Sequence, residues 1–243
     1  NIQIDLKVDN KTGVDDATVI DLKKFHVELG GNPIDATMHV STPVSDANIN
    51  ATVVAKINLA SMKDVIPMEK GDDLNGMIAA DVKMNGRMSS IDKGKYEEFD
   101  AKGNLSVTDM NYKTASLTYS TQIKKMEMSF NPKTVDLTAF DAQLGKSDIK
   151  LEGKIENFLQ YALKDSLLKG SFNLKSNLLD LNQLMASDEA PAATTAADTT
   201  PMTVAAVPPN LDVRLNANIG KMLYDNLTIT NVSGGVGIKD SKM

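Results

Sequence analysis

Residues 211–219 read Leu-Asp-Val-Arg-Leu-Asn-Ala-Asn-Ile, with an apolar residue at every odd-numbered position. Successive side chains of a β-strand point to opposite faces of the sheet, so this stretch predicts a strand with one apolar and one polar face. Strands that are wet on one face are typical of antiparallel sheets, because the helices of parallel sheets cover both faces. The stretch therefore predicts an antiparallel sheet with a single apolar side.

The same alternation recurs along most of the chain. It is found in the ranges 2–8, 34–40, 49–59, 78–84, 99–107, 126–130, 149–155 and 168–174. Helical spacing is confined to residues 157–167, with short helices or turns expected at 61–66 and 177–184, where Ser61 and Asn177 are candidate N-caps. The sequence thus predicts a mainly β protein with a few short helices.

Composition excludes several classes of function. The 243 residues carry a formal net charge of −6 and include no cysteine, and His26 and His39 are the only histidines. Disulfide scaffolds and cysteine-zinc sites are therefore excluded, and the acidic balance argues against nucleic acid, whose binders present clustered Lys and Arg. No G-x-S-x-G, H-E-x-x-H or P-loop motif is present. We expect no enzyme, no catalytic residue, no metal and no cofactor.

The two histidines allow one geometric test. A hairpin that closes at residues 30–33 with Leu29 opposite Ile34 would place Phe25 opposite Met38 and both histidines on the polar face. They would then be diagonal neighbours and could supply two metal ligands at best, whereas functional zinc sites use at least three protein ligands. Exposed, unrelated histidines are the expected outcome.

An internal repeat organises the chain. The motif Asp-Leu-x-x-Phe-x-x-x-Leu-Gly occurs at residues 21–30 and again at 136–145, an offset of 115, and Asn58-Leu59-x-Ser61 matches residues 173–176 at the same offset. A second match, at an offset of 112 to 110, joins residues 110–120 to 222–230. We expect about two copies of a multi-strand unit in a processed chain or an excised segment. The expected divisions are a first unit at 1–115, a second at 116–188, an Ala/Thr/Pro-rich linker or loop at 189–209, and the start of a further β unit of the same sheet at 210–243.

Two stretches resemble AsmA-like proteins. Residues 168–185 (LKGSFNLKSNLLDLNQLM) resemble the strand and short helix of that family, and residues 207–239 resemble its pair of strands followed by a Gly-rich strand. The resemblance implies a curved and twisted antiparallel sheet of repeated strand units that forms a groove for phospholipid acyl chains. It also implies a periplasmic protein of the bacterial envelope, held to the inner membrane by an anchor that this chain lacks, with a role in phospholipid transport or outer-membrane lipid homeostasis. Its envelope protein partners cannot be deduced from the sequence.

The residues themselves leave two functions open. An apolar sheet face must be covered by a second sheet, a helix or a ligand. Frequent inward Ala and Met suit mobile acyl chains, and they equally suit close sheet packing. The first hypothesis is the lipid groove, and the second is a closed β-sandwich used at the cell surface for adhesion or carbohydrate binding. The candidate groove residues are Ile149, Leu151, Phe172, Leu174, Leu211, Val213 and Leu215.

Overall fold

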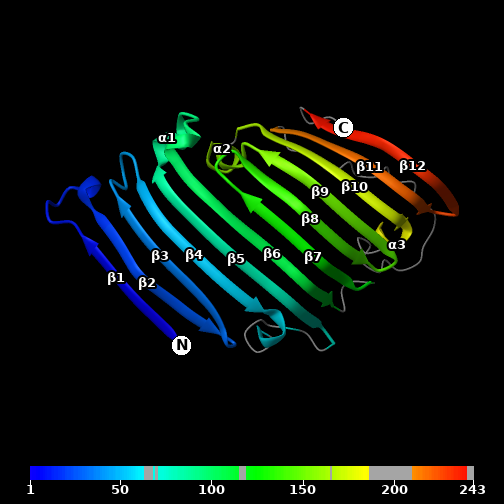
Figure 1. Cartoon of the computed structure of the whole chain (residues 1–243), viewed down its shortest axis with the longest axis horizontal. Coiled ribbons are helices and arrows are strands. Elements are labelled where there is room, and N and C mark those ends of the chain that lie inside the picture. Colours follow the sequence, from blue (N-terminus) through cyan, green and yellow to red (C-terminus); the bar gives the residue numbers. More distant parts are fainter. Residues whose placement is uncertain (63–67, 69–70, 115–118, 165, 186–209, 240–243) are drawn as a thin grey trace, which may run out of the picture.

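The protein is built from one open, curved sheet of twelve strands (Figure 1). The computed structural model describes residues 1–62, 68, 71–114, 119–164, 166–185 and 210–239. The strands lie side by side in the order in which they follow along the chain, and all neighbouring pairs but one are antiparallel. The predicted fold class, a mainly β, antiparallel, curved sheet with a few short helices, is confirmed. All of the described strands belong to one sheet, whereas a closed sandwich has two.

The strands are long and the helices are short. The strands are β1 Ile2–Asp9, β2 Val19–Leu29, β3 Asn32–Ser41, β4 Asn48–Asn58, β5 Asp73–Arg87, β6 Phe99–Lys113, β7 Thr121–Phe130, β8 Thr134–Leu144, β9 Ser147–Glu156, β10 Leu168–Asp180, β11 Leu211–Tyr224 and β12 Leu227–Lys239. The helices are α1 Met88–Asp92, α2 Phe158–Lys164 and α3 Leu181–Met185, with 3-10 helices η1 Asp15–Ala17, η2 Leu59–Met62 and η3 Tyr96–Glu98.

Strands β2 and β8 do not follow the alternation found in the sequence, because each contains a β-bulge. The register of β2 against β3 shifts between Leu22 and Phe25, and that of β8 against β9 shifts between Leu137 and Asp141. An inserted residue reverses the phase of alternation, so Leu22 and Phe25 both face the apolar side although they are three residues apart. The repeated motif Asp-Leu-x-x-Phe therefore marks a bulged strand.

The repeat has a structural counterpart in two hairpins. The bounds of β8 and β9 are those of β2 and β3 displaced by the same 115 residues that separate the sequence motifs. The match between residues 58–61 and 173–176 has no such counterpart, because Asn58 ends β4 whereas Asn173 lies in the middle of β10. The insertion of α2 before β10 displaces the later elements. The division of the chain into units stays a prediction.

One neighbouring pair, β10 and β11, is parallel, with Leu168 opposite Leu211 and Asp180 opposite Leu223. In the first half of the chain β4 and β6 both run antiparallel to β5, which lies between them. Strands β10 and β11 run in the same direction, as β4 and β6 do, but in the sheet they are direct neighbours. The antiparallel prediction fails at this one pair for that reason.

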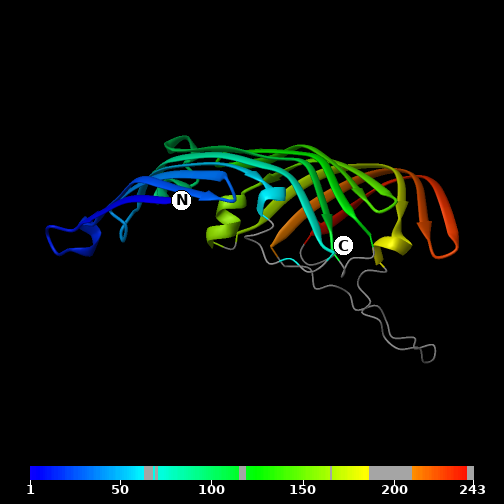
Figure 2. The same cartoon turned by 90° about the horizontal axis from the view of Figure 1, so that it is seen from below.

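The sheet forms an arch, and short helices lie at the ends of its strands (Figure 2). The turn from β1 to β2 carries η1, the connection from β5 to β6 carries α1 and η3, and that from β9 to β10 carries α2. We call this edge of the sheet the first rim. On the opposite edge, the second rim, η2 follows β4 and α3 follows β10. Both α2 and α3 lie on the inner side of the arch in Figure 2.

A small core lies where α1 and α2 meet the sheet. Ile91 of α1, with 2% of its surface exposed, packs with Phe99 and Ala101 of β6, and Leu159 of α2 packs against the same cluster. Phe158 of α2 contacts Phe130 of β7 edge to face, with ring centroids 6.1 Å apart. Because α2 packs on Phe130 and lies inside the arch, the apolar face of the sheet is its concave face.

The predicted helices are only partly right. Residues 157–167 do contain α2, but Asn177 belongs to β10 and does not cap a helix. Asp180 takes that role for α3, where its Oδ1 accepts the backbone N–H of Gln183 at 3.2 Å. Ser61 lies inside η2, so it is not an N-cap either. Residues 63–66 and the predicted linker at 189–209 lie outside the described residues.

Candidate functional site

The concave face is a continuous apolar surface that crosses all twelve strands. In the middle of the sheet Val53 lies opposite Val82, and Val82 lies opposite Gly103. The same face continues from there in both directions across the sheet. It reaches Ile4 opposite Phe25 at one end and Leu215 opposite Val236 at the other. Most of these side chains are half-buried. Among the described residues, all strands belong to one sheet and no second sheet covers this face.

The seven predicted groove residues lie together on this face. Leu174 of β10 lies opposite Leu151 of β9, and Phe172 lies opposite Leu215 of β11. The remaining three, Ile149, Leu211 and Val213, occupy positions of the same phase on β9 and β11. All seven are half-buried. The structure thus brings them onto one surface over three neighbouring strands, whereas their role as lipid ligands stays a prediction.

The prediction covered only three of the twelve strands of the face, β9 to β11. The first strand presents a more exposed part of it, with Ile2 at 66% and Leu6 at 54% exposed. These residues belong to an alternating stretch that was visible in the sequence, so the same signal could have found them. The bulged strands β2 and β8, which contribute Phe25 and Phe140, could have been found only by treating the repeated motif as a bulge.

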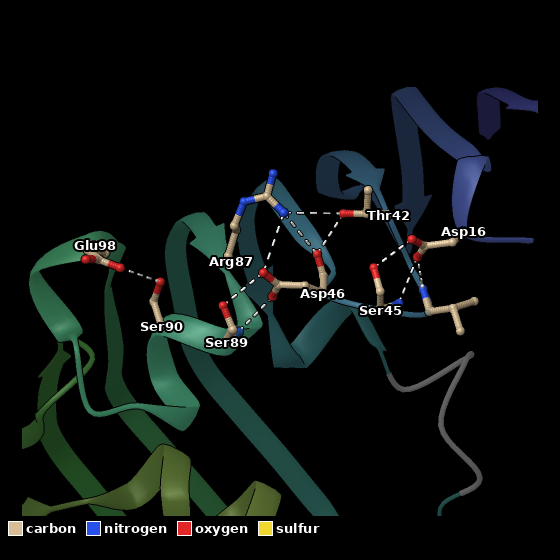
Figure 3. A network of polar contacts seen from close by, with 9 residues as sticks. Asp16, Thr42, Ser45, Asp46, Arg87, Ser89, Ser90 and Glu98 are labelled. Carbon is tan, nitrogen blue, oxygen red and sulfur yellow. Dashed lines mark hydrogen bonds and ion pairs between the residues drawn. The ribbon is translucent and has the colours of Figure 1, made fainter.

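Polar side chains join successive turns along the first rim (Figure 3). The Asp16 carboxylate accepts the backbone N–H of Val44 at 3.1 Å and both the N–H and the hydroxyl of Ser45 at 2.7 and 2.6 Å. The Asp46 carboxylate accepts the N–H and hydroxyl of Ser89 in α1, both at 2.9 Å. These hydrogen bonds favour the charged form, so the pKa of each carboxyl lies below its ordinary value. Each carboxylate fastens one hairpin to the next.

The second rim is held in the same manner. Asn32 closes the β2–β3 hairpin, donates to the Ser61 hydroxyl of η2 at 2.6 Å and accepts the N–H of Asn58 at 2.7 Å. In the second hairpin pair, Asp148 accepts the backbone N–H groups of Asn177 and Leu178, at 2.9 and 2.8 Å. These contacts link each hairpin to the following strand, so hydrogen bonds at both rims hold neighbouring strand ends together.

The polar face carries several exposed ion pairs. Over β7–β11 it has a hollow of about 440 Å³ whose lining includes Lys125, Lys150 and Asp141. Lys150 lies 3.6 Å from Asp141, and Lys125 lies 3.0 Å from Glu127. Such exposed pairs contribute at most about 1 kcal/mol each to folding. The lysines here are a solvated surface.

The histidines lie on the polar face, but the predicted pairing is wrong. Leu29 lies opposite Asn32, across a two-residue turn of Gly30 and Gly31 with φ of 54° and 78°. His26 therefore pairs with Asp35 at 2.7 Å, while His39 pairs with Asp21 at 3.0 Å. The two imidazoles stand at separate positions along the hairpin. Among the described residues, no group of three His, Asp or Glu side chains could hold a metal ion.

Two further findings bear on identity. None of the helices in the described part of the chain is long and apolar enough to cross a membrane. Comparisons of the chain with protein-family models, curated proteins and solved structures found no match. Membership of the AsmA-like family therefore stays an expectation that rests on the sequence resemblance.

Proposed function

We propose that the concave face binds the acyl chains of phospholipids and that the protein takes part in phospholipid transport or lipid homeostasis of a bacterial envelope. The observation that carries the proposal is the continuous apolar face on the inner side of the one sheet that the described strands form. Soluble proteins rarely expose contiguous apolar patches larger than a few hundred Å², and larger patches mark binding sites. The resemblance to AsmA-like proteins supports the same ligand and a periplasmic, membrane-anchored setting.

In this proposal the protein is not an enzyme. Binding is collective, because each methylene group that leaves water contributes about 0.8 kcal/mol wherever it lies on the face. An acyl chain has no hydrogen-bond donor or acceptor, so no polar contact fixes it at one position, and in this proposal it slides along the arch across the strands. The short helices of the two rims border this path.

The test uses two neighbouring residues on opposite faces of β10. A photo-crosslinking residue replaces Leu174, on the concave face, or Lys175, on the polar face, in protein expressed in bacterial periplasm. Phospholipid adducts are expected at position 174 and not at 175. Adducts to protein alone at position 174, or equal lipid capture at both positions, would show that the face is closed or that capture is nonspecific, and either result contradicts the proposal.

A further inference from the structure

We infer that phenylalanine rings lying across facing glycines level the floor of the concave face, and that Phe172 is the residue that controls how deeply an acyl chain sits there. This inference rests on the proposed function. It starts from three cross-strand pairs of the apolar face in which a phenylalanine lies opposite a glycine: Phe99 and Gly86, Phe130 and Gly103, and Phe172 and Gly153.

In each pair the ring occupies the space that a side chain of the facing residue would need. A Cβ atom added to Gly86 would come within 2.7 Å of the Phe99 ring, and one added to Gly103 or Gly153 would lie closer still to the rings of Phe130 and Phe172. The rings therefore lean sideways over the neighbouring strand. Glycine within a strand costs stability, and close approach of another group is one of its characteristic uses.

Phe172 shows this arrangement most fully. Its ring also lies over Gly170 of its own strand, where an added Cβ would be 3.2 Å from the ring. The ring thus fills a recess above two glycines instead of standing out from the sheet. Phe130 contacts Phe158 of α2, and Phe99 packs with Ile91 of α1 and Leu159 of α2.

A level floor has a specific consequence for a ligand that slides. An acyl chain gains free energy by contact, so a recess would hold it at one place and a raised ring would obstruct it. With Phe172 lying in its recess, the floor offers the chain similar contact along the whole of β9–β11. Removal of the ring exposes a recess that methylene groups can enter.

The test is binding of the fluorescent fatty acid cis-parinaric acid to the purified chain, measured together with urea unfolding. We expect Phe172→Ala to be less stable than the wild type but to bind about tenfold more tightly, equivalent to ~1.4 kcal/mol or roughly two buried methylene groups. The control is Leu215→Ala, on the neighbouring strand of the same face, which should weaken binding because it removes apolar contact without opening a recess over glycine. Gly170→Ala, which lifts the ring, should also weaken binding.

The outcomes separate the two proposals. A wild-type chain that does not bind the fatty acid contradicts the proposed function. If the wild-type chain binds and Phe172→Ala binds equally or more weakly, the proposed function stands and the levelling role is overturned. Loss of a ring that only stabilises the sheet would lower stability without tightening binding.

Discussion

At the scale of single residues, the structure depends on carboxylates that accept backbone N–H groups at the strand ends. Burial of the Asp148 carboxyl acts to raise its pKa, but hydrogen bonds from the N–H groups of Asn177 and Leu178 and from the Asn177 side chain outweigh that effect. The pKa of Asp148 therefore lies below its ordinary value. A carboxyl with a lowered pKa in the folded state stabilises that state when it is ionised.

We expect Asp148→Ala to lower the free energy of unfolding by about 1 kcal/mol at pH 7, because two backbone N–H groups lose their acceptor. The contribution is present above the pKa of the unfolded state and is lost as pH falls through the lower pKa of the folded state, so the gap between variant and wild type should narrow below about pH 4. Urea unfolding at pH 7 and below pH 4 measures both values.

The matched control is Asp100→Ala. Asp100 pairs with Lys102 on the polar face, and both side chains are about two-thirds exposed, at 67% and 65%. Removing such a pair should change stability by less than about 0.5 kcal/mol. Equal losses for the two variants at pH 7 would show that the Asp148 contacts have no special weight.

At the scale of elements, alternation predicted nine of the twelve strands, and two of the three that it missed, β2 and β8, share a physical cause. Strict alternation between 211 and 219 gave both the strand and its apolar phase, and the seven predicted residues share a face. The strands that contain Leu22 and Leu137 were missed because a bulge reverses the phase in mid-strand. Helix positions were poorly predicted because these helices are one or two turns long and depend on contacts such as Phe158 with Phe130.

Helix α2 gives a test at this scale. Its position depends on the edge-to-face contact of Phe158 with Phe130 and on Leu159, which packs on the Ile91 cluster. We expect Phe158→Ala to destabilise the protein by about 1–3 kcal/mol through lost burial and the lost aromatic pair. Amide exchange should accelerate in α2 and at Ile91 while the distant β2–β3 hairpin keeps its rate. Unchanged exchange in α2 would show that other contacts hold the helix.

At the scale of the whole molecule, each strand contacts chiefly its two neighbours in the sheet, as repeats do in solenoid proteins. The Ile91 cluster adds packing around β5 and β6, whereas β1 is an edge strand with apolar side chains that are more than half exposed. Stability should therefore vary across the sheet.

Hydrogen exchange followed by mass spectrometry tests this gradient. We expect protection to be greatest in β5–β7 and to fall toward β1 and β12, because edge strands can open without disturbing the centre. Identical opening free energies in β1 and β6 would instead mean that the arch unfolds as one cooperative unit, and the comparison with solenoids would fail.

The parallel pair of β10 and β11 has a consequence for direction. Up to β10, every odd-numbered strand ends at the first rim; β11 ends at the second, where its turn to β12 accepts the Asn182 side chain of α3 through the Asp225 carbonyl at 2.9 Å. The polarity of the chain is thus inverted from that point on, while the apolar residues keep their side. In a sheet whose strands pair only with their neighbours, a parallel pair can therefore reverse the direction of all later strands without interrupting the apolar inner surface.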